Sequence, residues 1–143
     1  MRIAGGGPEQ ARLHQLCEQK RLGATVRWLG DLSQSELAAE YQRAEVFCLP
    51  SVQEGFGIVF LEAMAAGKPI VAARAAAVPE VVTQGLLVEP ESGEALAEAI
   101  HRLYREPELR ASLASQGNHI VERYGAPEVA RLFLEEIQRV RAR

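Results

Sequence analysis

Several features are scarce in this sequence, and each shortage excludes a class of protein. The 143 residues include only two cysteines, Cys17 and Cys48, which lack both metal-ligand and CxxC spacing. Cys48 lies in an apolar segment where a buried thiol is ordinary, so a reducing compartment is expected. No apolar run approaches the ~18 residues of a membrane-spanning helix, and the first residues lack the regions of a signal peptide. The sequence therefore predicts a cytoplasmic protein.

An excess of charge of either sign is also missing. Sixteen Lys and Arg residues stand against 19 Asp and Glu residues, and the net charge is −3. This balance predicts no nucleic-acid partner and no general attraction to an anionic membrane surface. Any anionic ligand would have to be held by a local arrangement of residues.

The familiar nucleotide, metal and hydrolase motifs are absent. The run Gly5-Gly6-Gly7-Pro8 does not match the GxGxxG fingerprint and predicts a turn, and no GxxxxGK[ST] occurs. His14, His101 and His119 are far apart, and we expect each on a solvated helix face. Ser51 has no GxSxG context. Metal and serine-hydrolase chemistry are therefore poorly supported.

Apolar periodicity divides the chain into alternating strands and helices. Strands are predicted at residues 2–4, 26–29, 46–49, 70–73 and 86–88. Helices are predicted at residues 9–22, 33–43, 58–66, 79–82, 89–104, 107–123 and 127–141. This alternation predicts an α/β fold with a parallel sheet, in which ligands bind at the carboxyl ends of the strands. At this length a single domain is expected.

The most specific stretch, residues 50–64, follows one of these strands. Residues 46–49 are continuously apolar and predict a strand buried on both faces. Gly55 and Gly57 flank Phe56 just before a helix that is apolar almost all round, which favours burial of that helix. Glycines at a helix N-terminus let an anion approach several unsatisfied N–H groups.

These residue types predict a site for a nucleotide sugar. The backbone of Gly55, Phe56, Gly57 and Ile58 forms the expected diphosphate cradle. Glu54 could accept hydrogen bonds from sugar hydroxyls, and Glu62 could hold the two hydroxyls of a ribose.

Alternatives stay open for each residue. Glu54 could be a solvated loop residue. Glu62 is the only charge in an apolar helix, where burying an unpaired carboxylate is costly, but Lys68 or Arg74 could be an internal partner. The glycines could simply make a tight turn, and Phe56 is more often a core residue than a stacking platform.

A set of short motifs also runs through the chain in a fixed order. It comprises Gly5-Gly6-Gly7-Pro8, Trp28-Leu29-Gly30, Ala44-Glu45-Val46-Phe47, Leu49-Pro50-Ser51, Glu54-Gly55-Phe56-Gly57, Leu61-Glu62-Ala63-Met64-Ala65, Gly67-Lys68-Pro69-Ile70-Val71-Ala72 and Pro79-Glu80-Val81-Val82. In these motifs the chain resembles the C-terminal, donor-binding domain of GT-B fold glycosyltransferases of family 4, the glycosyl transferases group 1. The resemblance covers nearly everything from Ala4 to about Arg123.

The resemblance implies a Rossmann-like parallel sheet flanked by helices, as one half of a GT-B fold. It implies a retaining transfer of a sugar from a nucleotide-diphosphate donor. Glu54 would be the catalytic residue, in contact with hydroxyls of the donor sugar, and Glu62 would hold the ribose. The diphosphate would meet the amides of Gly55, Phe56, Gly57, Ile58 and Val59, and the loop of Gly30, Asp31 and Leu32 would lie near the base. The implied scheme needs no metal and no cofactor beyond the donor substrate.

The chain also departs from the family pattern. Residues 1–143 are expected to form the donor-binding domain without its first strand and helix and without the N-terminal acceptor domain, so the isolated chain should bind a nucleotide weakly and be inactive. Ala76-Ala77 stands where the family commonly has Gly-Gly, which could narrow the donor loop.

The expected partners follow from what the chain lacks. They are a nucleotide-sugar donor and either the missing N-terminal domain or a partner chain. An uncovered sheet edge makes a homodimer a further expectation. The alternatives to a donor-binding domain are a non-catalytic remnant or interaction domain, and half of another GT-B enzyme such as a nucleotide-sugar epimerase or a phosphorylase.

Overall fold

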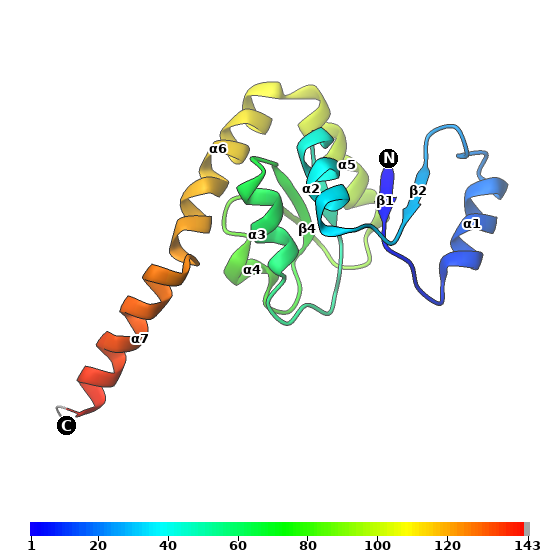
Figure 1. Ribbon diagram of the computed structural model, residues 1–143. Helices are drawn as coiled ribbons and strands as arrows, with labels where there is room; N and C mark the ends of the chain where they lie inside the picture. The colour runs from blue at the N-terminus through cyan, green and yellow to red at the C-terminus, as the bar shows by residue number, and fades with distance from the viewer. Residues whose placement is uncertain (142–143) are drawn as a thin grey trace. The chain divides into compact units, whose positions relative to one another are not determined.

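The computed structural model describes residues 1–141 of the chain. The chain divides into two compact units, Met1–Gln42 and Arg43–Arg143, and each unit is described by itself. Parallel strands alternate with helices in both units, which confirms the predicted α/β class (Figure 1). The described strands fall in two parallel sheets, of two and three strands. The expectation that residues 1–143 form one domain stays a prediction.

The first unit holds a two-stranded sheet. Its elements are β1 (Arg2–Ala4), α1 (Gln10–Gln19), β2 (Arg27–Gly30) and α2 (Gln34–Arg43), whose last residue crosses the boundary. β1 and β2 run parallel, with a register shift before the last pair. Ser33 and Glu36 cap α2 reciprocally: the Ser33 N–H donates to Glu36 Oε2 at 2.8 Å, and the Glu36 N–H donates to Ser33 Oγ at 3.4 Å. Ser33 is therefore the residue that caps the start of α2.

α1 corrects one expectation about histidine. The His14 ring stacks on Trp28 of β2, with centroids 4.4 Å apart, and its Nε2 is buried without a partner among the described residues. The prediction of a solvated face is therefore wrong for His14, because α1 turns this residue toward the sheet. His101 and His119 are exposed, as predicted.

The second unit holds a three-stranded parallel sheet in the order β3-β4-β5 (Figure 1). Its elements are β3 (Phe47–Leu49), α3 (Ile58–Ala65), β4 (Ile70–Ala73), α4 (Val78–Val81), β5 (Leu86–Val88), α5 (Gly93–Arg105), α6 (Pro107–Arg123) and α7 (Ala126–Arg141). The central strand β4 is buried at all four residues, and α5 packs against both β4 and β5. Phe60 and Met64 of α3, with Leu103 of α5, are among the fully buried side chains of this unit.

Two expectations about burial are wrong in this unit. β3 is an edge strand, and its Cys48 is exposed rather than enclosed on both faces, although partial burial raises the pKa of the thiol. α3 buries only one face: Phe60, Ala63 and Met64 point inward, whereas Ile58 is 63% exposed and Glu62 is exposed. An apolar composition therefore does not by itself show that α3 is surrounded by protein.

α3 ends just before Gly67, the residue that follows the predicted helix of residues 58–66. The φ of Gly67 is +67°, and its N–H donates to the Met64 carbonyl at 2.9 Å, while the Lys68 N–H donates to the Ala63 carbonyl at 2.9 Å. These two bonds form a Schellman motif, which satisfies the last carbonyls of the helix. No helix among residues 1–141 combines the length and the apolar character needed to cross a bilayer.

Candidate functional site

The loop between β3 and α3 places a glycine at the helix N-cap. Gly57 has φ +75° and ψ +53°, in the left-handed region that disfavours side chains. A Cβ on Gly57 would lie 2.6 Å from Cδ2 of Phe60. Phe60 is fully buried and packs edge-on against Phe47, so its ring has little room to move. Local backbone conformation and core packing thus both require glycine at this position.

Successive backbone amides lie free ahead of this helix. Phe60 N–H donates to the Gly57 carbonyl at 2.9 Å, which closes the first turn. No described residue accepts a hydrogen bond from the N–H groups of Gly55, Phe56, Gly57 or Ile58. A Cβ on Gly55 would meet no atom within 4 Å, so the space beside this amide is open. Free N–H groups together with the positive end of the α3 dipole make a local site for an anion.

The two carboxylates flank this loop in different environments. Glu54 is half-buried in the loop, and Glu62 is exposed one turn into α3. The sequence argument for Glu62, that burial of a lone carboxylate is costly, is therefore wrong for this helix. Glu62 also interacts with another residue of the chain, as does Val59. The ligand roles of Glu54, Val59 and Glu62 stay predictions.

Phe56 is not a core residue. It is 46% exposed, and its ring meets Tyr124 edge-on, with centroids 5.3 Å apart and an interplanar angle of 77°. Phe60 fills the core instead, at 0% exposure. From the sequence, Tyr124 falls in the break between the helices predicted at residues 107–123 and 127–141. An aromatic residue at a helix end was the one sequence feature that could have indicated this contact.

The first unit brings two loops together at the carboxyl ends of β1 and β2. The Gly5 N–H donates to the Gly30 carbonyl at 2.7 Å, and both glycines have positive φ. A Cβ on Gly6 would lie 3.9 Å from Oδ1 of Asp31. The glycine turn predicted at Gly5-Gly6-Gly7-Pro8 thus lies beside the loop of Gly30, Asp31 and Leu32. Its position next to Asp31 follows from the parallel pairing of the two strands, which the sequence pattern alone did not reveal.

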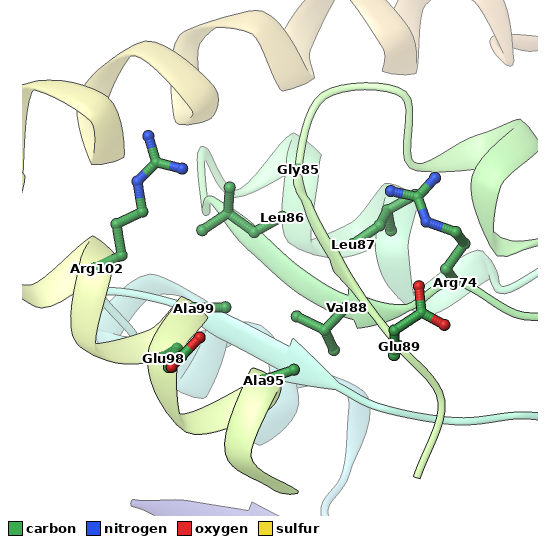
Figure 2. A pocket seen from close by; sticks show the side chains of 10 residues that line it. All are labelled: Arg74, Gly85, Leu86, Leu87, Val88, Glu89, Ala95, Glu98, Ala99 and Arg102. Carbon is green, nitrogen blue, oxygen red and sulfur yellow. The ribbon is translucent and has the colours of Figure 1, made fainter. Parts of the chain in front are cut away.

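A separate groove of about 530 Å³ lies along β5 and α5, and none of the predicted donor-binding residues lines it. Its polar lining carries both signs of charge, with Arg102 and Glu98 on one side of the view and Arg74 and Glu89 on the other (Figure 2). Among the described residues no three His, Cys, Asp or Glu side chains form a group that could hold a metal ion.

Comparison with known proteins identifies the family. The model for the family described as glycosyl transferases group 1 matches residues 1–119. The chain belongs to this glycosyltransferase family. The resemblance to the glycosyl transferases group 1 that the short motifs indicate is therefore confirmed.

Relatives of known name match the chain over most of its length. A D-inositol 3-phosphate glycosyltransferase of Streptomyces bingchenggensis is 34% identical over 134 residues, which cover 87% of this chain and 30% of that protein. A GDP-mannose-dependent alpha-(1-6)-phosphatidylinositol monomannoside mannosyltransferase of Mycobacterium tuberculosis is 33% identical over 129 residues, covering 83% of this chain and 34% of that protein. The chain thus spans about a third of the length of these relatives.

Solved glycosyltransferase structures share the fold. Sucrose-phosphate synthase of Thermosynechococcus elongatus aligns with a TM-score of 0.80 and 31% identity, over 96% of this chain and 37% of that one. Anabaena HepE, solved in complex with UDP-glucose, aligns with a TM-score of 0.84 and 26% identity, over 96% of this chain and 40% of that one. These neighbours are larger proteins, and the glycosyltransferase chain corresponds to a part of each.

Proposed function

We propose that this glycosyltransferase chain is the donor-binding part of a retaining enzyme of family 4 and binds a nucleoside-diphosphate sugar. The observation that carries the proposal is the loop before α3, where the left-handed Gly57 caps the helix and the amides of Gly55, Phe56, Gly57 and Ile58 have no acceptor among the described residues. In a chain of this family, a diphosphate is the anion that such a cradle suits.

The cradle would act mainly on the transition state. As the bond from the sugar to the diphosphate breaks, the leaving group gains negative charge. N–H groups already fixed around that position stabilise the developing charge without reorganising. Ile58 and Val59 begin α3, whose dipole adds positive potential at the same end.

The remaining proposed roles divide the donor into its chemical parts. Glu54 contacts hydroxyls of the sugar next to the reacting carbon, and Glu62 accepts hydrogen bonds from the ribose. The role in base binding that the resemblance implies for Gly30, Asp31 and Leu32, which belong to the first unit, stays a prediction. The scheme uses no resident metal, because amides and a helix terminus supply the positive potential.

The acceptor site lies outside the proposed role of this chain. A further domain or a partner chain would supply it, as the larger size of the relatives and structural neighbours suggests. The isolated chain would bind a donor without transferring sugar, in the cytoplasm, either alone or as a homodimer.

Calorimetric titration with nucleoside diphosphates tests the proposal. UDP and GDP are the first probes, because HepE was solved with UDP-glucose and the mycobacterial relative is GDP-mannose-dependent; ADP completes the set. We expect one of them to bind. Glu62→Ala is expected to weaken that binding by roughly tenfold, the effect of losing about one charge-assisted hydrogen bond.

Glu98→Ala is the matched control, since Glu98 is also an exposed helical glutamate but lines the groove beside β5. It should bind as the wild type does. The proposal fails if no nucleoside diphosphate binds or if Glu62→Ala binds equally well. Weakened binding by Glu98→Ala alone would place the ligand in the groove of Figure 2 instead.

A further inference from the structure

α6 lies directly against the helix that begins at the candidate site. A Cβ on Gly117 of α6 would lie 3.1 Å from Cγ and 3.5 Å from Cα of Met64 in α3, so the absence of a side chain there allows the close approach. Ile120, the next buried residue of α6, is 6% exposed. Since both Gly117 and Met64 are buried, α6 has a fixed position relative to α3.

The C-terminal end of α6 then reaches the loop ahead of α3. Tyr124 is the C-cap residue, and its N–H donates to the Val121 carbonyl at 3.0 Å. Its ring meets the ring of Phe56 in an edge-to-face arrangement, with centroids 5.3 Å apart. The half-buried Tyr124 thus extends a rigid helix to the residue between the two glycines of the loop.

The loop has few other restraints at this point. Gly57 is held by the first turn of α3. At Gly55, by contrast, an added Cβ would meet no atom within 4 Å, and no described residue accepts a hydrogen bond from its N–H group. Glycine leaves the backbone free to sample many conformations. Phe56 is the one large side chain between them; it is 46% exposed, and its ring contacts Tyr124 edge-on.

We infer that Tyr124 is a positioning residue: it acts through Phe56 to hold the amides of residues 55–57 in the orientation that receives the diphosphate. The inference rests on the proposed function for its ligand, but the ordering of the loop is a property of the ligand-free chain. A cradle ordered before binding avoids the entropic cost of ordering it during binding, so loss of the Tyr124 ring should weaken affinity. An edge-to-face pair corresponds to roughly a 3- to 10-fold effect.

Three variants of the full chain test this inference. Tyr124→Ala removes the ring, and Tyr124→Phe keeps the ring and removes only the hydroxyl. Tyr104→Ala is the control, because Tyr104 is 76% exposed. Backbone ¹H–¹⁵N spectra and amide hydrogen exchange of Gly55, Phe56 and Gly57 are recorded without ligand, and titration with UDP and GDP follows.

In Tyr124→Ala we expect shifted resonances and faster exchange at residues 55–57, together with roughly 3- to 10-fold weaker binding of the nucleoside diphosphate. Tyr124→Phe and Tyr104→Ala should match the wild type. If Tyr124→Ala unfolds the chain, Tyr124→Leu removes the aromatic edge while it keeps an apolar side chain, and the same changes are expected.

The inference is overturned if the ring-deleted variant leaves the amides of residues 55–57 unchanged, or if Tyr124→Phe is as defective as Tyr124→Ala. Weaker binding with unchanged ligand-free amides would also overturn it, because Tyr124 would then contact the ligand itself. If the wild type binds no nucleoside diphosphate, the proposed function fails, and the ligand-free spectra still decide whether Tyr124 orders the loop.

Discussion

Replacement of Gly57 by alanine tests whether the loop before α3 is fixed by the fold. Two effects act on the folded state. A left-handed conformation costs a non-glycine residue about 1–2 kcal/mol. The new Cβ would also lie 2.6 Å from Cδ2 of the fully buried Phe60, and overpacking of this kind costs about 1–3 kcal/mol.

One effect acts in the opposite direction. Alanine lowers the entropy of the unfolded chain, which offsets about 0.4–1 kcal/mol of the loss. We therefore expect Gly57→Ala to lower the free energy of unfolding by about 3 kcal/mol. Followed by far-UV circular dichroism, this corresponds to a urea midpoint lower by roughly 1.5 M.

Gly67→Ala separates the two unfavourable effects. Gly67 has nearly the same left-handed φ, +67° against +75°, but a Cβ there would meet nothing within 4 Å. Only the conformational effect remains, so we expect a loss of about 1 kcal/mol. Equal destabilisation by the two variants would refute the steric argument, since it would mean that Phe60 moves aside freely. A neutral Gly57→Ala would refute the left-handed conformation itself.

Four further variants test other parts of the fold. Ala76→Gly should stabilise the chain by up to about 1 kcal/mol, because Ala76 has φ +47° and glycine relieves that strain. Ala77→Gly, at the N-cap of α4 where φ is −78°, relieves no such strain and should stabilise the chain less in the same urea experiment. Ser92→Ala removes the side-chain cap that accepts from Ala95 N at 3.2 Å, and thermal unfolding should show a loss of about 1 kcal/mol. Hydrogen bonds from the side chain and backbone of Ser33 lower the pKa of Glu36, so this carboxylate contributes stability above its unfolded pKa and loses it as the pH falls through the folded pKa; NMR titration of Ser33→Ala should show the Glu36 pKa returning upward.

Much of the fold could be predicted from the sequence because it depends on local periodicity. The helices at residues 107–123 and 127–141 match α6 and α7 closely, and the glycine stop of α3 lies where it was expected. Apolar character, however, does not reveal which element covers a residue. Cys48 and Glu62 show this: the strand and helix around them are apolar, but both side chains are exposed.

The sequence predicted which loop forms the candidate site but not how that loop packs. The order of Glu54, Gly55, Phe56 and Gly57 indicated an anion-binding loop, since glycine and helix N-termini act through the local backbone. The contact between Phe56 and Tyr124 joins residues 68 positions apart, and no periodic pattern reports such a pair. His14 was misjudged for a similar reason, because its stacking on Trp28 depends on how α1 packs against β2.

The two glycines of the loop are constrained by different forces. Gly57 is required by its left-handed φ and by the buried ring of Phe60, so any family member with this packing would need glycine there whether or not it binds a ligand. Gly55 has no positive φ, and a Cβ added to it would meet no atom within 4 Å, so the folded chain itself does not require glycine there. A requirement for glycine at position 55 would therefore have to come from something outside the chain that approaches its backbone. The glycine at position 57 is thus explained by the fold alone, and only a measured requirement for glycine at position 55 would point to a ligand in this loop.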